Sequence, residues 1–227
     1  MKVFSYFDPV PDINSSEEAQ LASLWRRSWA ASEFVPVMLT HQIVQSHPKF
    51  AEYDALVRSF PTVNPPGYDL ACWHRWLALD MAGGGLMTDY DVICRAFSPE
   101  LLQFPDPITI LDRGGVPCAV YVTAAGARQL VDDILSFPHK HDGKHYSDMF
   151  FFQAKGYPRA GSLTAPYDSP DFPTAPAVHF SHRDCGTLAP NHARFIVVRK
   201  EMADIFFTPE SIVASGIDKI NLRPEIG

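Results

Sequence analysis

Residues 75–92 constrain the fold of this chain more than any other stretch. They indicate an amphipathic helix, a run of three glycines, a short apolar segment, and then two carboxylates, Asp89 and Asp91, on either side of Tyr90. Glycine lets the backbone turn sharply and lets a ligand approach closely, so the apolar segment is expected to be a strand whose end carries both carboxylates. Because Mn²⁺ and Mg²⁺ prefer oxygen ligands and are commonly completed by substrate phosphates, the pattern predicts a divalent-cation site.

The elements predicted around this stretch alternate between strands and helices. Residues 3–7 and 35–40 are strand candidates, and a helix between them is predicted to begin at Ser15, with Glu18 completing a capping box. Strand, helix, strand is the opening unit of a parallel sheet. The remaining expected elements are helices over 48–60, 69–81 and 124–137, the last capped by Thr123, a helix or strand over 147–152, strands over 108–111, 119–122 and 193–198, and a long surface loop over 157–176.

The chain length and the element order together predict the fold class. With 227 residues the chain is long enough for one sizeable core, so a single domain over 1–227 is expected. The order of elements predicts an α/β fold with a central, mostly parallel mixed sheet flanked by helices. The four tryptophans occur at helical spacing and are expected in the core.

Charge and cysteine usage narrow the class of protein. The formal net charge of −7 argues against a nucleic-acid binder, which normally carries a basic surface. The four cysteines form no closely spaced pair, which is typical of free thiols in a reducing compartment. No signal peptide and no run of about 20 apolar residues is evident. We therefore expect a cytoplasmic protein with no transmembrane segment and at most peripheral membrane contact.

The segment from Tyr68 to Val92 resembles the sugar-transfer signature of retaining glycosyltransferases with the GT-A fold, a Rossmann-like domain. The likeness is to the branch that includes capsular-polysaccharide and initiating mannosyl-type transferases and the clostridial glucosylating toxins. Those proteins combine an Asp-x-x-Arg helix, a glycine pair and an Asp-x-Asp strand end, matched here by Arg75, the glycine run and the two aspartates. The resemblance implies metal-dependent transfer of a sugar, with retention, from a nucleotide-diphosphate sugar to a glycan or other hydroxyl acceptor.

The resemblance also implies roles for the residues of this signature. Asp91 would ligate Mn²⁺ or Mg²⁺, and Asp89 would hold the ribose and the water shell of the metal. Arg75 would face the donor sugar or its phosphates, since a planar fork of donors suits oxyanions. UDP-sugars are the favoured donors by analogy. Residues 1–95 would form the nucleotide-sugar-binding half, and 96–227 the acceptor-side half with a C-terminal closing loop.

Residues outside the signature receive roles from the same resemblance. Ser5 and Tyr6 would seat the nucleotide base and ribose at the end of the first strand, and Tyr90 is grouped with these nucleotide-binding residues. Asp148 would place a carboxylate near the sugar or the acceptor hydroxyl. His182 would lie in a C-terminal loop that closes over the diphosphate, and would add a metal ligand.

The sequence departs from the family pattern at Cys72, at Gly85, and at Met87-Thr88, where the family has an aromatic residue. Cys72 stands three residues before Arg75, where the family has an aspartate that commonly binds sugar hydroxyls. A third glycine, Gly85, lengthens the turn by one residue. The first departure puts the identity of the donor sugar in doubt.

Simpler structural explanations exist for several of these residues. The two aspartates could be solvated surface carboxylates, Arg75 could be a helix-surface arginine, and Asp148 could belong to a helix cap. The segment 139–145 carries three histidines and could hold zinc or contact a phosphate or an acceptor, although a solvated loop is the default.

Two other functions compete with the transferase. One is a metal-dependent nucleotidyltransferase or phosphohydrolase that uses the same carboxylates, although such enzymes usually need further acidic ligands for a second metal. The other is a non-catalytic nucleotide-sugar-binding protein, for which Cys72 is the best argument.

Overall fold

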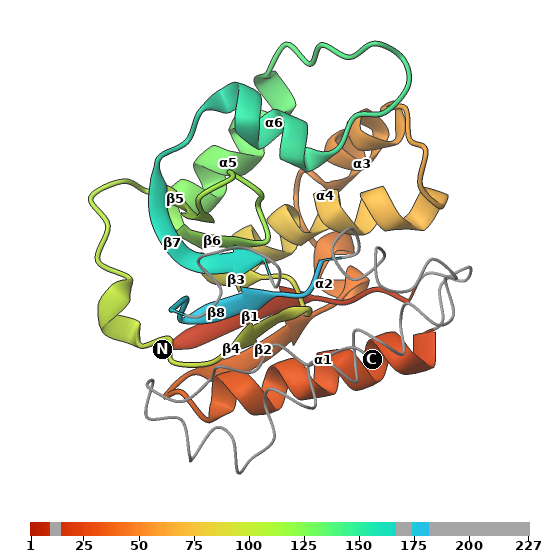
Figure 1. The fold of residues 1–227 in the computed structure, drawn as a ribbon. Helices are drawn as coiled ribbons and strands as arrows, with labels where there is room; N and C mark the ends of the chain where they lie inside the picture. Colours follow the sequence, from red (N-terminus) through yellow and green to blue (C-terminus); the bar gives the residue numbers. More distant parts are fainter. Residues whose placement is uncertain (10–14, 167–173, 182–227) are drawn as a thin grey trace, which may run out of the picture.

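The computed structural model of the chain describes residues 1–9, 15–166 and 174–181. In these residues an eight-stranded sheet forms the middle layer, and helices cover both of its faces (Figure 1). The strands are β1 (Lys2–Tyr6), β2 (Val35–Leu39), β3 (Gly85–Thr88), β4 (Val92–Cys94), β5 (Ile108–Asp112), β6 (Ala119–Val122), β7 (Arg159–Pro166) and β8 (Ala177–His179). The helices are α1 (Ser15–Ala30), α2 (His41–Gln45), α3 (Phe50–Arg58), α4 (Pro66–Met81), α5 (Ala124–Ser136) and α6 (Asp148–Lys155), with a 3₁₀ turn at Pro99–Leu101.

The sheet is mixed and mostly parallel, with the strand order β2-β1-β3-β6-β5-β7-β8-β4. β1 pairs in parallel with β2 and β3, and β7 pairs in parallel with β5 and β8. The pairs β3–β6, β5–β6 and β4–β8 are antiparallel. The α/β class and the mixed central sheet expected from the sequence are therefore confirmed.

The first three parallel strands create a topological switch point. β1 lies between β2 and β3, so the chain leaves β1 toward one neighbour and later returns on its other side. α1 covers one face of this part of the sheet, while α4, α5 and α6 lie over the opposite face (Figure 1). In open α/β sheets, ligands bind in the crevice outside the carboxyl ends of strands at such a point. Asp89 follows β3 directly at this edge.

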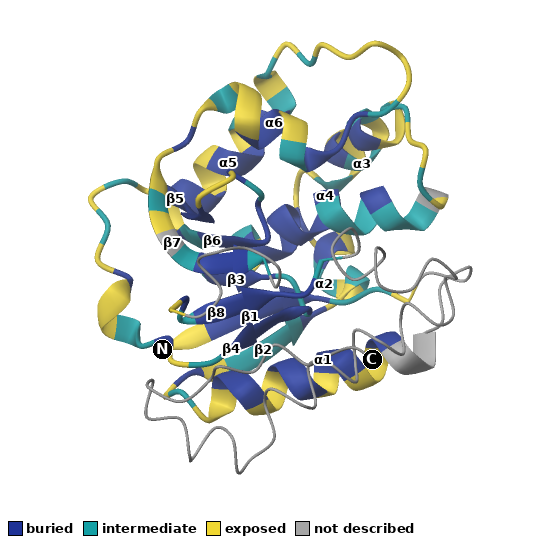
Figure 2. Ribbon diagram, viewed as in Figure 1, coloured by how far each residue is buried: buried dark blue, intermediate teal, exposed yellow. Residues whose placement is uncertain are grey.

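Two hydrophobic clusters form the core, one on each face of the sheet. Alternation along β1 sends Val3 to the α1 side and Phe4 to the α4 side. Trp25 and Trp29 belong to the first cluster, and the indole rings of α4 belong to the second. Figure 2 shows the buried strands between the half-exposed helices. All four tryptophans are at most 1% exposed, as expected for core residues.

The three glycines after α4, the last of which begins β3, form a tight turn that only glycine fits well. Gly83, Gly84 and Gly85 have φ angles of 82°, 78° and 133°, which L-residues with side chains rarely adopt. A Cβ atom at Gly84 would lie 2.7 Å from backbone atoms of Thr123. The glycine run therefore forms a turn that lies directly against the backbone of the neighbouring residues 122–123.

The structure corrects three of the predicted elements. Residues 159–166, which lie inside the predicted surface loop, form β7 because β5 and β8 supply backbone partners on both sides. Residues 41–45 form an unpredicted helix, and the helix predicted over 48–60 begins at Phe50. The ambiguous 147–152 segment is helical, and Gly156 ends this helix in a left-handed conformation.

The other predicted elements agree with the structure or lie outside it. α1 begins at Ser15, and Thr123 caps α5 by accepting a hydrogen bond from the Gly126 N–H. The strand predicted over 193–198 lies outside the described residues. Among the described helices, none combines the length and the apolar character that a membrane crossing needs. The division into halves at residue 95 stays a prediction, and β4 from the first half pairs with β8 from the second.

A pair of alanine substitutions should separate the two demands of the glycine turn. Gly84→Ala is expected to lower the free energy of unfolding by about 3 kcal/mol, because it combines a strained φ with a backbone clash. Gly83→Ala, which has a similar φ but no atom within 4 Å of the new Cβ, should cost only about 1–2 kcal/mol. Urea unfolding measures both values, and equal losses would contradict the close packing at Gly84.

Candidate metal site at the carboxyl edge of the sheet

The turn after β3 presents two aspartates from a firmly held backbone. The Asp89 N–H donates to the Cys118 carbonyl at 2.8 Å, which ties the start of the turn to the segment before β6. The Asp91 carbonyl accepts from the Phe180 N–H at 2.9 Å, which ties the end of the turn to the segment after β8. The backbone of the Asp-Tyr-Asp turn is therefore held from two separate parts of the chain.

Two indole groups of α1 anchor the residues that flank this turn. Trp25 Nε1 donates to Thr88 Oγ1 at 2.8 Å, directly before the first aspartate. Trp29 Nε1 donates to the Val92 carbonyl at 3.0 Å, directly after the second aspartate. The tryptophans lie four residues apart, so they project from the same side of the helix. α1 therefore covers one face of the sheet and also holds the two ends of the turn.

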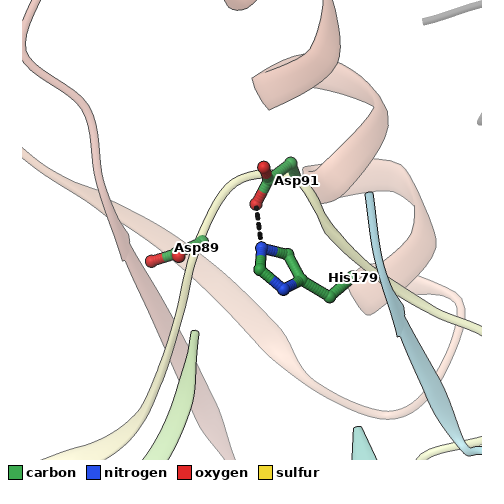
Figure 3. A group of neighbouring side chains, drawn as sticks. All are labelled: Asp89, Asp91 and His179. Atoms are coloured by element: carbon green, nitrogen blue, oxygen red, sulfur yellow. Dashed lines mark ion pairs between the residues drawn. The ribbon is translucent and has the colours of Figure 1, made fainter. Parts of the chain in front are cut away.

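Strand pairing brings a histidine from far along the chain to the same place. β4 and β8 are antiparallel, with Val92 opposite His179. The Nε2 atom of His179 lies 3.5 Å from Asp91 Oδ1, and the two side chains face each other in Figure 3. Both side chains are buried, whereas Asp89 is about one-third exposed, with 30% of its side chain accessible. The group is therefore closed on one side and reachable on the other.

Asp89, Asp91 and His179 form a donor set that suits a divalent cation. Their ligand atoms all lie within 4.8 Å of one another, and no other group of this kind occurs among the described residues. Adjacent ligands of an octahedral ion are separated by roughly 3 Å, close to the 3.5 Å between Asp91 and His179. Two carboxylates and one imidazole, with space left on the exposed side, fit Mn²⁺ or Mg²⁺ that keeps water or phosphate ligands.

Arg75 links this group to α6. One terminal nitrogen of its guanidinium donates to Asp89, and the other donates to Asp148 Oδ2 at 2.6 Å. The same Asp148 oxygen accepts from Trp76 Nε1 at 3.1 Å, and the Arg75 guanidinium lies 4.5 Å above the Trp76 ring. Arg75 is only 5% exposed, which excludes the alternative that it is a helix-surface arginine. The Asp148 carboxylate accepts these bonds instead of capping its helix.

The charges at this site do not balance. Burial lowers the pKa of Arg75, but the Asp148 and Asp89 carboxylates outweigh it and hold that pKa above its ordinary value. Burial raises the pKa of Asp148, with Arg75 opposing the shift. Loss of water also raises the pKa of Asp89, and the adjacent Asp91 carboxylate adds to this shift. The Arg75 guanidinium bonds to Asp89 and Asp148, and Asp91 adds a third carboxylate close to Asp89, so a bound cation would bring positive charge to a mainly acidic group.

Cys72 does not reproduce the carboxylate that the family places there. Burial raises the pKa of its thiol well above the usual range, so the side chain is a neutral group at pH 7. Asp69, one turn earlier on α4, accepts hydrogen bonds from Thr62 and Asn64 and lies away from the cation group. Within the described residues, no carboxylate of α4 takes the position of the missing aspartate.

The residues predicted to seat the nucleotide lie at the end of β1, beside the turn. Ser5 is fully buried within the sheet, and the Tyr6 hydroxyl lies 3.4 Å from His41 Nδ1. Tyr90 packs edge-on against Phe7, with ring centroids 5.5 Å apart, and both rings are half-buried. Of the aromatic rings beside the turn, those of Tyr90 and Phe7 are therefore partly exposed, and the sequence reasoning gave Phe7 no role in the site.

The predicted third metal ligand, His182, lies outside the described residues. His179, three residues earlier, is the histidine that the structure places beside the aspartates. From the sequence alone, His182 is assigned to the metal and His179 receives no role. A signal was available, because His179 ends the apolar run Ala177-Val178, as a residue at the tip of a buried strand would.

Comparison with protein-family models finds no match to this chain, and comparison with curated proteins finds none either. The resemblance to retaining glycosyltransferases therefore stays a prediction that rests on the residues of the signature. That prediction has to agree with the geometry of the Asp89–Asp91–His179 group and of Arg75.

Replacing Asp148 should show how far the site depends on the buried ion pair. Asp148→Asn keeps the shape of the side chain but leaves part of the Arg75 charge unpaired, so we expect a loss of about 2–4 kcal/mol in the free energy of unfolding. Asp132→Asn removes a carboxylate from the exposed pair with Lys49 and should cost less than about 0.5 kcal/mol. Equal effects in denaturant titrations would show that the buried pair contributes no more than a surface contact.

Proposed function

We propose that the protein is a metal-dependent glycosyltransferase that transfers a sugar from a nucleotide-diphosphate sugar, with a UDP-sugar as donor. The observation that carries this proposal is the Asp89–Asp91–His179 group at the switch point of the parallel strands. A site with that donor set and that position suits a diphosphate held through a divalent cation. The acceptor would be the hydroxyl of a glycan or of another molecule.

The side chains of this site divide the work between holding the metal and positioning its ligands. Asp91 and His179 would hold the ion, and Asp89, which is partly exposed, would contact it directly or through water. A bound Mn²⁺ or Mg²⁺ would supply Lewis-acid stabilisation of charge on the departing diphosphate. Arg75 fixes the Asp89 carboxylate, and its own position is fixed by Asp148.

Asp148 has a different role in this proposal from the one that the sequence suggested. Its side chain is 3% exposed and its Oδ2 atom already accepts two hydrogen bonds. We therefore assign it as a positioning residue for Arg75. A carboxylate that directly contacts the sugar is not needed for retention by front-face attack, in which the acceptor hydroxyl approaches from the side of the leaving group.

Two observations bear on the competing functions. Phosphohydrolases and nucleotidyltransferases with two metals need a second acidic ligand set, and the described residues hold a single cation group. Cys72 favours a binding protein without turnover, because it removes a sugar-binding carboxylate. We also propose the cytoplasm as the place of reaction, because Cys72, Cys94 and Cys118 are free thiols, which persist in reducing compartments.

The thermal unfolding shift produced by UDP with Mn²⁺ tests the donor site directly. A ligand at about 100 times its dissociation constant should add roughly 2.7 kcal/mol to the free energy of unfolding. We expect this stabilisation to require both UDP and Mn²⁺ and to disappear in Asp91→Asn and in His179→Ala. Asp132→Asn, which changes an exposed carboxylate far from the site in sequence, should shift as the unchanged protein does.

The outcomes separate the proposed functions. Metal-dependent stabilisation with release of UDP from a UDP-sugar supports the transferase. Stabilisation without turnover on any tested sugar supports the binding protein. If GDP stabilises the protein and UDP does not, the donor base is guanine instead of uracil, and the proposal of a glycosyltransferase stands. The absence of a shift with any nucleotide would leave the aspartates as structural charges and would refute the metal-dependent donor site.

The stereochemistry of the product is a separate prediction. Retention requires the product linkage to have the same anomeric configuration as the donor sugar, because the acceptor attacks from the leaving-group face. The measurement is the proton coupling constant of the newly formed linkage, recorded by NMR early in the reaction. An inverted linkage would overturn the retaining assignment without affecting the metal site.

A further inference from the structure

A pocket lies between α6 and the loop that precedes it. Residues from 137–146 and the side of α6 that carries Phe150 and Gln153 line this partly open pocket of about 830 Å³. Sites for small molecules usually have volumes of about 300–1,000 Å³. None of the lining residues belongs to the Asp89–Asp91–His179 group, so this pocket is distinct from the candidate metal site.

One wall of the pocket is aromatic. Tyr146 and Phe150 lie nearly parallel, with ring centroids 6.2 Å apart and planes inclined by 17°. The imidazole of His141 lies 5.8 Å from the Tyr146 ring, and that of His145 lies 5.9 Å from the Phe150 ring. Phe150 is 39% exposed although it is a large apolar side chain. Tyr146 is only 4% exposed and supports Phe150 from behind, so the uncovered apolar surface on which the body of a ligand can pack is that of Phe150.

The rim of the pocket is basic although the protein as a whole is acidic. Lys140 and Lys144 both line it, together with two histidines. The Lys144 ammonium lies 3.8 Å from the Asp142 carboxylate, whereas Lys140 forms no ion pair with the described residues. In a chain with a formal net charge of −7, two lysines and one aspartate at a pocket rim form a locally cationic surface. Such a surface complements an anionic group.

The base of the pocket is held in place by structural contacts. Both ring nitrogens of His139 are engaged, one with the Tyr146 hydroxyl at 3.0 Å and the other with the Ile134 carbonyl at 2.7 Å. The Tyr146 N–H donates to the Pro61 carbonyl at 2.8 Å. These contacts do not support a zinc site over 139–145, because His139 has no free nitrogen for a metal. They indicate instead a pocket that is formed before any ligand binds.

We propose that this pocket binds a small organic phosphate, a phosphate ester whose apolar or ring-shaped body packs on Phe150 while its phosphate contacts Lys140 and Lys144. A doubly charged phosphate matches two ammonium groups better than a singly charged carboxylate does. A concave pocket of this volume encloses a small molecule, whereas a membrane contact would present a flat or convex surface. The proposal does not depend on the transferase function, since it involves neither a metal nor a nucleotide.

Phenylphosphonate, which resists hydrolysis, is the probe that tests this pocket. Calorimetric titration of the full chain, without metal or nucleotide, should show saturable binding of one equivalent. Inorganic phosphate and benzyl alcohol, each of which carries one half of the probe, should each bind at least tenfold more weakly. Benzoate should be weaker than phenylphosphonate, because it offers a single negative charge to the two lysines.

Substitutions at the rim and at the aromatic wall provide matched variants. The double variant Lys140→Gln/Lys144→Gln should weaken phenylphosphonate binding about tenfold, and Phe150→Ser should weaken it by a similar factor. Lys2→Gln, at an exposed lysine of β1, should bind as the unchanged protein does. The substituted lysines are exposed, so the unfolding curves of the lysine variants are expected to stay the same and to show that their loss of binding is local.

Four results would overturn this proposal. The first is no saturable binding of phenylphosphonate, and the second is unchanged affinity in the double lysine variant. The third is binding only to phosphatidylcholine vesicles that contain phosphatidic acid, which would make the surface a membrane contact. Loss of probe binding in Asp91→Asn would place the probe at the metal site instead, whereas normal binding in that variant keeps the two sites separate.

Discussion

The buried guanidinium of Arg75 is the interaction on which the candidate site depends. It joins three separate parts of the chain, namely α4, the turn after β3 and the first turn of α6. A charge removed from water is costly unless its partners are well placed, and two carboxylates provide that here. The flat, forked shape of the group lets it serve both partners at once, which an ammonium on a flexible stem would do poorly. The position of Asp89 therefore depends on α6.

The sheet and α1 provide the second part of this support. The carboxyl ends of β1 and β3 lie side by side, and the tryptophan indoles of α1 hold the residues immediately before and after the Asp-Tyr-Asp turn. Packing and hydrogen bonding thus act on the same few residues. A metal site gains precision when the groups behind its ligands are themselves fixed. Here helices on both faces of the sheet contribute to that second layer.

Sequence reasoning succeeded where the signal was local and failed where it was not. The helix, the glycine turn and the strand before Asp89 were predictable from hydrophobic spacing and from the conformational freedom of glycine. β7 was not, because it lies in the stretch 157–176, whose proline and serine content indicates a loop, and its backbone partners come from distant strands. His179 was not assigned as a ligand, because its place beside Asp91 depends on the register of β4 against β8. The Arg75–Asp148 contact is likewise a consequence of tertiary packing.

The pairing of β4 with β8 also sets the order in which the site can be assembled on the ribosome. Asp91 is synthesised 88 residues before His179, since 179 − 91 = 88. At translation rates of about 5–20 residues per second, this interval lasts roughly 4–18 s. During that time the nascent chain carries the acidic turn without its imidazole partner and without the second strand that holds Phe180 against it. The cation group is therefore one of the last features of the domain to form, although two of its three ligands lie in the first hundred residues.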